Sequence, residues 1–199
     1  MEFSYVNPTQ IHFGKGQISQ VATSIPADQK VLVIYGGGSI KRNGVYQQVS
    51  EALKDHQWFE FAGVEPNPVM ETLDKAVALV KEHGIEFILA VGGGSVIDGA
   101  KYVAAAARYD GQGWDILLGT CSVEDAVPLG AVLTLPATGS ESNPGAVISR
   151  AETQDKLAFV APAVQPRFAV LDPDVMKTLP EQQLVNGIVD AWVHICEQY

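Results

Sequence analysis

In the stretch FILAVGGGSVIDGAKY, residues 87–102, an apolar run leads into a glycine-rich turn and then into a helical pattern. An earlier stretch, VLVIYGGGSIKR at residues 31–42, repeats this design with the same four-residue turn, GGGS. Glycine lets the backbone approach an anion closely, and the first amide groups of the following helix have no acceptor within the helix. Two such turns predict a binding site for a dinucleotide.

Each turn alone also has a simpler interpretation. Glycine would close a corner between strand and helix, Ser39 or Ser95 would cap the helix, and Asp98 would complete a capping box. Two identical turns favour binding, because they can lie side by side at the carboxyl edge of one parallel sheet. Neither turn has the G-x-G-x-x-G pattern of an ordinary Rossmann dehydrogenase.

The alternation of short apolar runs with helical patterns predicts a parallel α/β sheet. The predicted strands are residues 31–35, 87–91, 131–135 and 168–171, and the main predicted helices are residues 70–82 and 96–109. Residues 9–13 alternate in polarity and end at Gly14, so we expect a further strand, at a sheet edge or shared with a second subunit. Thr178 and Glu181 have capping-box spacing and predict a helix toward Tyr199, with a domain boundary near residue 180.

The composition narrows the class of protein. With 199 residues, 47% of them hydrophobic, the chain can build one core around one sheet. A net charge of -10 disfavours nucleic acid and anionic membrane surfaces as partners, which leaves a small-molecule ligand. The chain has two cysteines, no signal-like opening and no apolar run of about 18 residues, so we expect a cytoplasmic protein.

Two further segments carry polar side chains that can contact a nucleotide. The strand end and loop at residues 134–143 offer the hydroxyl groups of Thr134, Thr138 and Ser140 to a base, ribose or phosphate, although a polar surface loop has the same composition. Asn67, in the sequence EPNP at residues 65–68, lies either in a rigid connection or against a bound nucleotide.

Asp190 and His194 are four residues apart on the predicted last helix. This spacing places both side chains on one face, where they can bind one divalent ion or form a surface ion pair. A metal site needs more ligands than two, and these would have to come from beyond Tyr199 or from another chain.

Six motifs together, in this order, resemble those of the iron-containing alcohol dehydrogenase family, and in particular its branch of NADPH-dependent butanol dehydrogenases and aldehyde reductases. They are FGKG at 13–16, YGGGS at 35–39, EPNP at 65–68, GGGSVIDG at 92–99, LPATGSES at 135–142 and DAWVH at 190–194. The resemblance implies a Rossmann-like nucleotide-binding domain of the dehydroquinate synthase-like type over residues 1–180. Residues 181–199 would begin an all-helical metal-binding domain, so the chain looks truncated to about half of such an enzyme.

The resemblance also implies roles for individual residues. Gly93, Gly94 and Ser95 would hold the pyrophosphate, and Thr134, Thr138 and Ser140 would line the adenosine and ribose side. Asp98 would lie near the nicotinamide, and Lys156, in a hairpin after Arg150, would approach its ribose. Asp190 and His194 match the first two ligands of a divalent metal, iron or alternatively zinc or nickel, which polarises a substrate carbonyl while the cofactor delivers hydride.

The first turn bears on the choice of cofactor. An acid after the first strand accepts from the ribose 2′-OH of NAD and repels a 2′-phosphate. Here Gly37, Gly38 and Ser39 are followed by Lys41 and Arg42, with no acid in between, so NADP(H) is the expected cofactor, and Asn67 can add a donor.

Three functions follow as hypotheses. The first is a metal-dependent alcohol dehydrogenase or aldehyde reductase that acts on small alcohols or aldehydes, of which this chain is the nucleotide-binding portion and forms a homodimer through its N-terminal strand. The second is a dehydroquinate synthase-like lyase, whose substrate calls for basic contacts that residues 138–143 do not supply. The third is a nucleotide-binding protein without catalytic activity.

Overall fold

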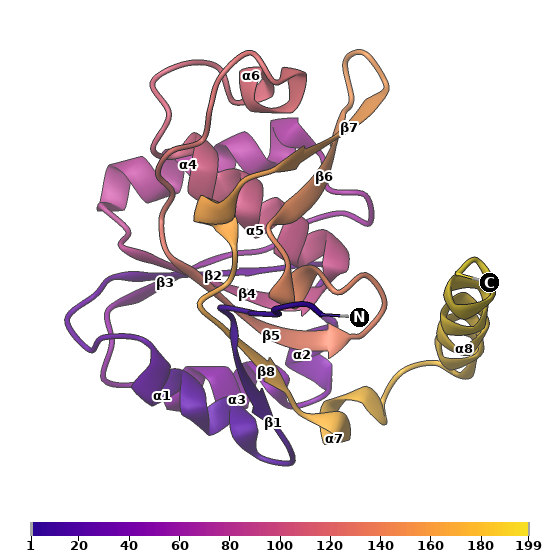
Figure 1. Cartoon of the computed structure of the whole chain (residues 1–199). Coiled ribbons are helices and arrows are strands. Elements are labelled where there is room, and N and C mark those ends of the chain that lie inside the picture. The colour runs from indigo at the N-terminus through magenta and orange to yellow at the C-terminus, as the bar shows by residue number, and fades with distance from the viewer. Residues whose placement is uncertain (1, 199) are drawn as a thin grey trace.

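A sheet of six parallel strands lies at the centre of the computed structural model, which describes residues 2–198 (Figure 1). Across the sheet the order is β1 (Gln10–Phe13), β8 (Phe168–Leu171), β5 (Leu129–Leu135), β4 (Phe87–Gly93), β2 (Val31–Tyr35) and β3 (Trp58–Phe61). The predicted parallel α/β fold is confirmed.

The predicted strands differ from the observed ones mainly at their ends. Strands β2 and β8 have the predicted bounds, whereas β4 and β5 are each two residues longer. Strand β3 was not predicted, because this outermost strand is only partly buried and its short, mixed sequence gives little apolar signal.

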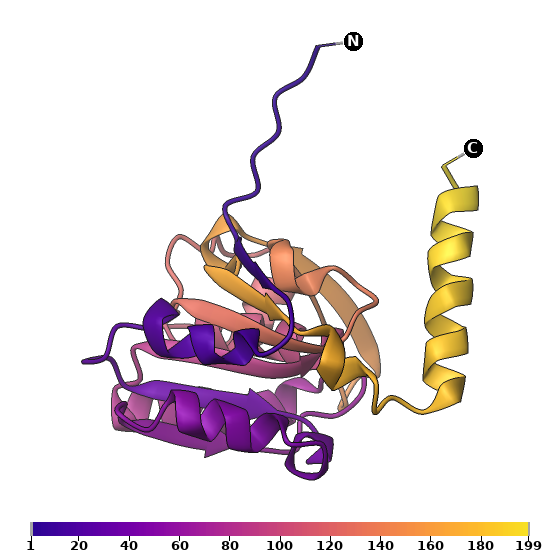
Figure 2. The same ribbon diagram turned by 90° about the horizontal axis from the view of Figure 1, so that it is seen from below.

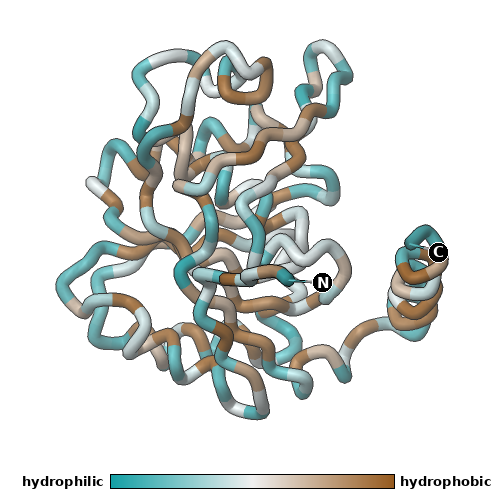
Figure 3. The backbone as a smooth tube through the Cα atoms, viewed as in Figure 1, coloured by the Kyte–Doolittle hydropathy of each residue, from teal (hydrophilic) through white to brown (hydrophobic). Residues whose placement is uncertain are grey.

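Helices cover both faces of the sheet, because successive residues of a buried strand point to opposite sides. On one face Leu32 and Ile34 pack with α4 (Met70–His83), α5 (Gly94–Ala106) and α6 (Gly113–Leu118). On the other, Val31 and Val33 pack with η1 (Gln17–Gln20), α1 (Val21–Ser24), α2 (Ser39–Arg42), α3 (Val45–Ala52) and α7 (Pro173–Met176). Each fully buried Leu, Ile or Phe side chain contributes about 1.5–3 kcal/mol to stability. Figure 3 shows hydrophobic residues concentrated along the strands.

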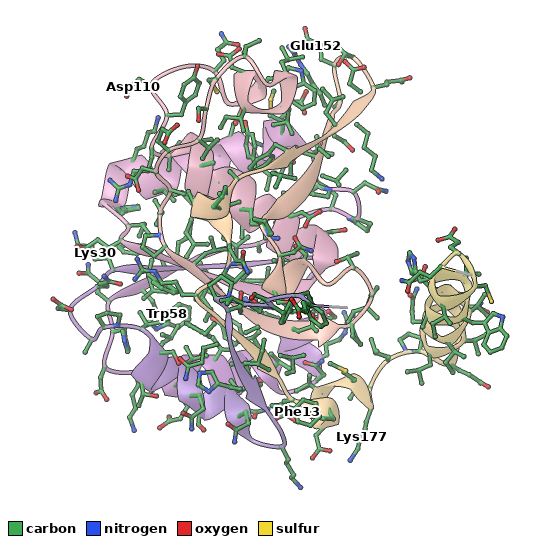
Figure 4. All side chains as sticks on the ribbon, in the orientation of Figure 1. Phe13, Lys30, Trp58, Asp110, Glu152 and Lys177 are labelled. Carbon is green, nitrogen blue, oxygen red and sulfur yellow. The ribbon has the colours of Figure 1, made fainter. Side chains whose placement is uncertain are left out.

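A hairpin lies over helix α5. Its antiparallel strands are β6 (Gly145–Arg150) and β7 (Asp155–Val160), flanked by η2 (Ser140–Ser142) and η3 (Pro162–Val164). Ala146, Ile148 and Phe159 anchor it in the same core as α5. Glu152 marks the hairpin tip, at the opposite end of the molecule from Lys177 (Figure 4). The hairpin predicted after Arg150 is therefore present.

The N-terminal strand β1 forms the edge of the sheet, as predicted for one of its two alternatives. It pairs with β8 of its own chain, in parallel. Residues 2–8 precede it as an exposed segment that leads away from the body (Figure 2). Phe3, Tyr5 and Val6 are exposed in this segment, and Phe13 is exposed on the strand itself.

Helix α8 (Glu181–Cys196) lies apart from the body in both ribbon views (Figures 1 and 2). None of its residues is buried, although its exposed side chains include Ile188 and Trp192. The predicted capping box is wrong: Pro180 is the N-cap residue, and the Thr178 hydroxyl donates to the carbonyl of Val175 at the end of α7. No helix within residues 2–198 is both long and apolar enough to cross a membrane.

Candidate nucleotide-binding site

The two glycine-rich turns lie at the point where the order of the strands reverses. Strand β2 is followed along the chain by β3 on one side, whereas β4, on the other side of β2, is followed by β5. Ligands of open α/β sheets bind in the crevice at the carboxyl ends of the strands at such a point. Because β2 and β4 are adjacent and parallel, the turns that follow them lie side by side at this edge of the sheet, where the general rule places a crevice, and their predicted juxtaposition is confirmed.

The second turn presents backbone to the crevice. Gly93 is the N-cap residue of α5, and Gly94 is its first residue. A Cβ atom on Gly94 would overlap the Thr138 side chain, and one on Gly93 would lie 3.2 Å from the Leu135 Cβ. The thirteen-residue helix therefore begins with free amide groups at a position that only glycine fits, which suits the pyrophosphate of a dinucleotide.

The interpretation of Ser95 and Asp98 as helix caps is wrong. The Ser95 hydroxyl accepts from the Asn67 amide, with a distance of 3.3 Å between the nitrogen and Oγ. The Asp98 carboxylate accepts from the Ser140 hydroxyl at 2.5 Å and from the Val147 amide at 3.0 Å. Both side chains thus tie α5 to segments distant in the sequence.

Asn67 joins the second turn to the hairpin. Its backbone has a φ of 58°, in the left-handed region that non-glycine residues rarely adopt. Its side-chain Oδ1 accepts from Lys156 Nζ at 2.8 Å, while its backbone amide donates to the hydroxyl of Ser95. The structure therefore brings together three predicted site residues from three separate elements.

The loop after β5 supplies the remaining predicted hydroxyl groups. Thr134 is half-buried at the carboxyl end of β5, and Thr138 is exposed beside Gly94. Ser140 is only 2% exposed, and its hydroxyl bonds to Asp98 and Lys101. Its geometry suits support of the site from behind better than direct contact with a ligand.

Lys101 belongs to this site although it was not predicted. Its side chain is fully buried, and Nζ donates to Ser140 Oγ at 2.8 Å, Asn143 Oδ1 at 3.1 Å and the Gly145 carbonyl at 2.6 Å. Burial lowers the pKa of Lys101 to about 8, against the opposing effect of Asp98 and Glu141. The available signal was a single lysine in a helix of alanine and other apolar residues.

The first turn is more exposed than the second. Gly38 has a φ of 85°, and Gly37 and Ser39 are exposed at the start of α2. Arg42 is exposed too, and it forms no ion pair within the part of the chain that the structure describes.

Of the two cations that follow the first turn, Lys41 has an acid beside it. Lys41 Nζ lies 3.5 Å from the Glu60 carboxylate and above the rings of Tyr35 and Tyr46. Both tyrosine hydroxyls donate to Glu60, at 2.9 and 3.1 Å. Partial burial of Glu60 raises its pKa, but the hydrogen bonds from the two tyrosines and the charge of Lys41 outweigh it, so the net pKa is lowered. Glu60, on the unpredicted strand β3, thus places an acid next to Lys41.

Asp190 and His194 lie outside this cluster, on α8. His194 Nε2 is 3.6 Å from Asp190 Oδ1, and its Nδ1 is 3.6 Å from Glu197 Oε2, with all three side chains exposed. Among residues 2–198, no group of three or more His, Cys, Asp or Glu side chains is placed to hold a metal ion. The pair has the geometry of a surface ion pair here, and its role as a metal ligand stays a prediction.

An open cavity of about 660 Å³ lies elsewhere, between α6 and the end of β7. Its walls are mostly apolar side chains and backbone, including Leu118, Val160 and Cys121, and they carry no charged side chain. Such a lining offers little to a phosphate, so the crevice between the turns remains the better nucleotide site.

This chain is similar in sequence and in fold to known proteins. A family model described as iron-containing alcohol dehydrogenase matches residues 8–173. The chain is 56% identical to the NADPH-dependent aldehyde reductase YqhD of Escherichia coli K12, over 99% of this chain and 52% of that protein. It is 50% identical to the "Probable NADH-dependent butanol dehydrogenase 2" of Bacillus subtilis, over 99% of this chain and 51% of that protein.

A solved structure supports the fold. The crystal structure of E. coli K-12 YqhD matches with a TM-score of 0.94 and 56% identity, covering all of this chain and 52% of that one. The chain thus spans about half the length of the relatives it matches.

The close approach at Gly94 generates a prediction. Gly94→Ala should lower the free energy of unfolding by about 1–3 kcal/mol, because the added methyl group displaces Thr138 and its loop. Gly37→Ala is the matched control: its Cβ meets nothing within 4 Å and its φ is not positive, so stability should change by less than about 0.5 kcal/mol. Urea unfolding measures both, and equal stabilities of the two variants would contradict the packing described.

Proposed function

Because this chain belongs to the iron-containing alcohol dehydrogenase family, we propose that it is the nucleotide-binding portion of a metal-dependent oxidoreductase. The reaction is hydride transfer between NADP(H) and small alcohols or aldehydes. The observation that carries the proposal is the pair of glycine-rich turns on either side of the crevice between β2 and β4.

Different site residues contact different parts of the dinucleotide. Gly93, Gly94 and Ser95 bind the pyrophosphate at the start of α5, since the first backbone amides of a helix have no acceptor within it and no side chain caps them here. The second turn lies between the first turn and the loop after β5. The first turn supplies backbone groups, and Thr134 and Thr138 supply hydroxyl groups, to the adenosine and ribose, while Ser140 supports this side from behind.

Asp98 and Lys156 serve the nicotinamide end, whereas Asn67 stays a further donor to the cofactor. Lys156 reaches toward the second turn through its bond to Asn67, and it can donate to ribose hydroxyls in the same way. Bound NADPH supplies the hydride, and the chain's own residues bind the cofactor and fix its orientation toward a carbonyl compound.

NADPH is the proposed cofactor, although the names of the relatives include both NADPH and NADH dependence. Lys41 forms an ion pair with Glu60, so Arg42 and the Ser39 hydroxyl are the groups available to a 2′-phosphate. No acid lies within residues 36–42 to repel it.

Asp190 and His194 are proposed as two ligands of the divalent metal. A carboxylate oxygen and an imidazole nitrogen suit iron, zinc or nickel, and the i, i+4 spacing lets both reach one ion. Two ligands leave an ion mostly hydrated, so further ligands are required for a working site.

A homodimer in the cytoplasm completes the proposal. The outer edge of β1 has no strand beside it among the described residues, and the apolar side chains of Phe3, Tyr5 and Val6 precede it. We place the pairing with a second copy on this exposed apolar segment, because apolar side chains next to a free sheet edge favour association. Cys121 and Cys196 are both free, as is usual in a reducing compartment.

The cofactor proposal predicts that the chain binds NADPH about tenfold or more tightly than NADH, because the 2′-phosphate forms charge-assisted bonds. Arg42→Met should reduce this ratio, whereas Lys75→Met, at an exposed lysine of α4, should not. Ser39→Asp should favour NADH, and it is a better test than Gly38→Asp because Gly38 has a positive φ. Fluorescence titration measures each dissociation constant, and equal affinities of the wild-type chain for both cofactors would refute the preference.

The metal proposal predicts that the 199-residue chain binds NADPH but does not oxidise it in the presence of butanal. His194→Ala should remove the residual weak binding of Fe²⁺ or Zn²⁺ and leave NADPH affinity unchanged, because α8 lies apart from the crevice. Metal titration and absorbance at the NADPH band measure the two effects. Butanal-dependent oxidation by this chain alone would show that the metal assignment is wrong.

The dimer proposal predicts that deletion of residues 2–6 converts a dimer into a folded monomer. These residues are exposed, and the deletion spares β1 and the bonds that Asn7 and Thr9 form. Deletion of residues 182–198 is the control, because it removes the other exposed apolar segment and should leave the dimer intact. Light scattering decides, and an unchanged mass after the first deletion would count against this interface.

A further inference from the structure

The side chain of Lys101 lies behind the candidate site, between α5 and the loop at 138–145 that leads into the hairpin. It is fully buried and donates to three acceptors on the loop: Ser140, Asn143 and the carbonyl of Gly145. Lysine is almost never fully buried without such partners, because removing an ammonium group from water is costly. The burial of this ammonium group therefore indicates a specific structural role for Lys101.

Ser140 connects Lys101 to the site. Its oxygen accepts from the ammonium group, and its hydroxyl proton is donated to Asp98. The second oxygen of Asp98 accepts from the backbone amide of Val147, in the first strand of the hairpin that carries Lys156. One ammonium group thus fixes, through a single hydroxyl, a carboxylate on α5 and the path of the chain into the hairpin.

Lys101 also fixes the shape of the loop itself. Asn143, which accepts from Lys101 through Oδ1, donates through its amide nitrogen to the Gly139 carbonyl at 2.9 Å. Within the same loop, the Ser140 amide donates to Thr138 Oγ1 at 3.3 Å, and Thr138 packs against Gly94. The position of Thr138 beside the second glycine-rich turn consequently depends on the contacts of Lys101.

We propose that Lys101 is a positioning residue for the cofactor, which holds Asp98 and the loop at 138–145 in the geometry that binds the dinucleotide. Lys101 itself does not touch the cofactor. The proposal rests on the proposed function, since the crevice must bind a nucleotide for the loop to matter.

Three variants test this role. Lys101→Met keeps the apolar stem and removes the donors, and Ser140→Ala keeps the ammonium group but breaks its link to Asp98. Lys75→Met makes the same change of charge at an exposed lysine of α4. Hydrogen exchange of the Val147 amide in the free chain reports on Asp98, and fluorescence titration reports on NADPH.

Both site variants should raise the NADPH dissociation constant about tenfold or more and speed Val147 exchange by a similar factor, because buried acceptors lose their donors. Lys75→Met should match the wild type in both. If Lys101→Met does not fold, Ser140→Ala alone decides. Wild-type affinity in a folded Lys101→Met or Ser140→Ala chain would overturn the proposal, even if Val147 exchanged faster.

The pH dependence separates positioning from simple support of the fold. Asp98 and Glu141 are the charged groups that act on Lys101, and burial lowers its pKa to about 8. A neutral amine donates one bond fewer, so NADPH affinity of the wild type should fall about threefold from about pH 7 to about pH 9.5. The fall should be absent in Lys101→Met, and its persistence there would overturn the proposal.

Nucleotide binding by this chain and the positioning role of Lys101 can be refuted separately. A wild-type chain that binds no NADPH would refute the proposed function and, with it, the role of Lys101 toward the cofactor. In that case Val147 exchange in Lys101→Met would still show whether the ammonium group holds Asp98. Wild-type exchange in that variant would overturn the positioning role as well.

Discussion

The close contact between helix α5 and the loop that follows β5 is the constraint on which the rest of the site depends. It exists because Gly94 has no side chain, so Thr138 can occupy the space that a Cβ atom would fill. The helix can then begin directly at the end of the central strand β4, with its first amide groups facing the crevice. The parallel sheet contributes the second half of the arrangement, since it places the turn after β2 next to the turn after β4.

Charge is distributed to match this geometry. The whole chain carries a net charge of -10, so an anionic ligand needs local positive potential. The start of α5 supplies it through backbone dipoles. Near the site, two lysines are associated with acids: Lys101 with Asp98 through Ser140, and Lys41 with Glu60. Arg42 is exposed at the rim beside the first turn, which is why cofactor selection is assigned to that turn.

Much of the fold and part of the site could be predicted from the sequence. Strands β2 and β4 contain continuous apolar runs that are followed directly by glycines, a pattern that specifies both the strand and its turn. Lys101 and Asn143 could not be predicted, because the hydrogen-bond partners of Lys101 lie 39 to 44 residues away in the sequence. Glu60 could not be predicted either, because it lies on an edge strand with little apolar signal. The caps assigned to Ser95 and Thr178 were wrong because other hydrogen bonds compete with local capping. Ser95 accepts from the backbone of Asn67, and Thr178 donates to the carbonyl of Val175 in the preceding helix.

The most direct test of the central claim, that the crevice between the two turns binds a dinucleotide, is an NMR titration of the ¹⁵N-labelled chain with NADPH. The account predicts that the backbone amide signals of Gly37, Ser39, Gly94 and Ser95 shift together and saturate with one dissociation constant. Shifts confined to the cavity between α6 and β7, or saturation of only one of the two turns, would contradict it.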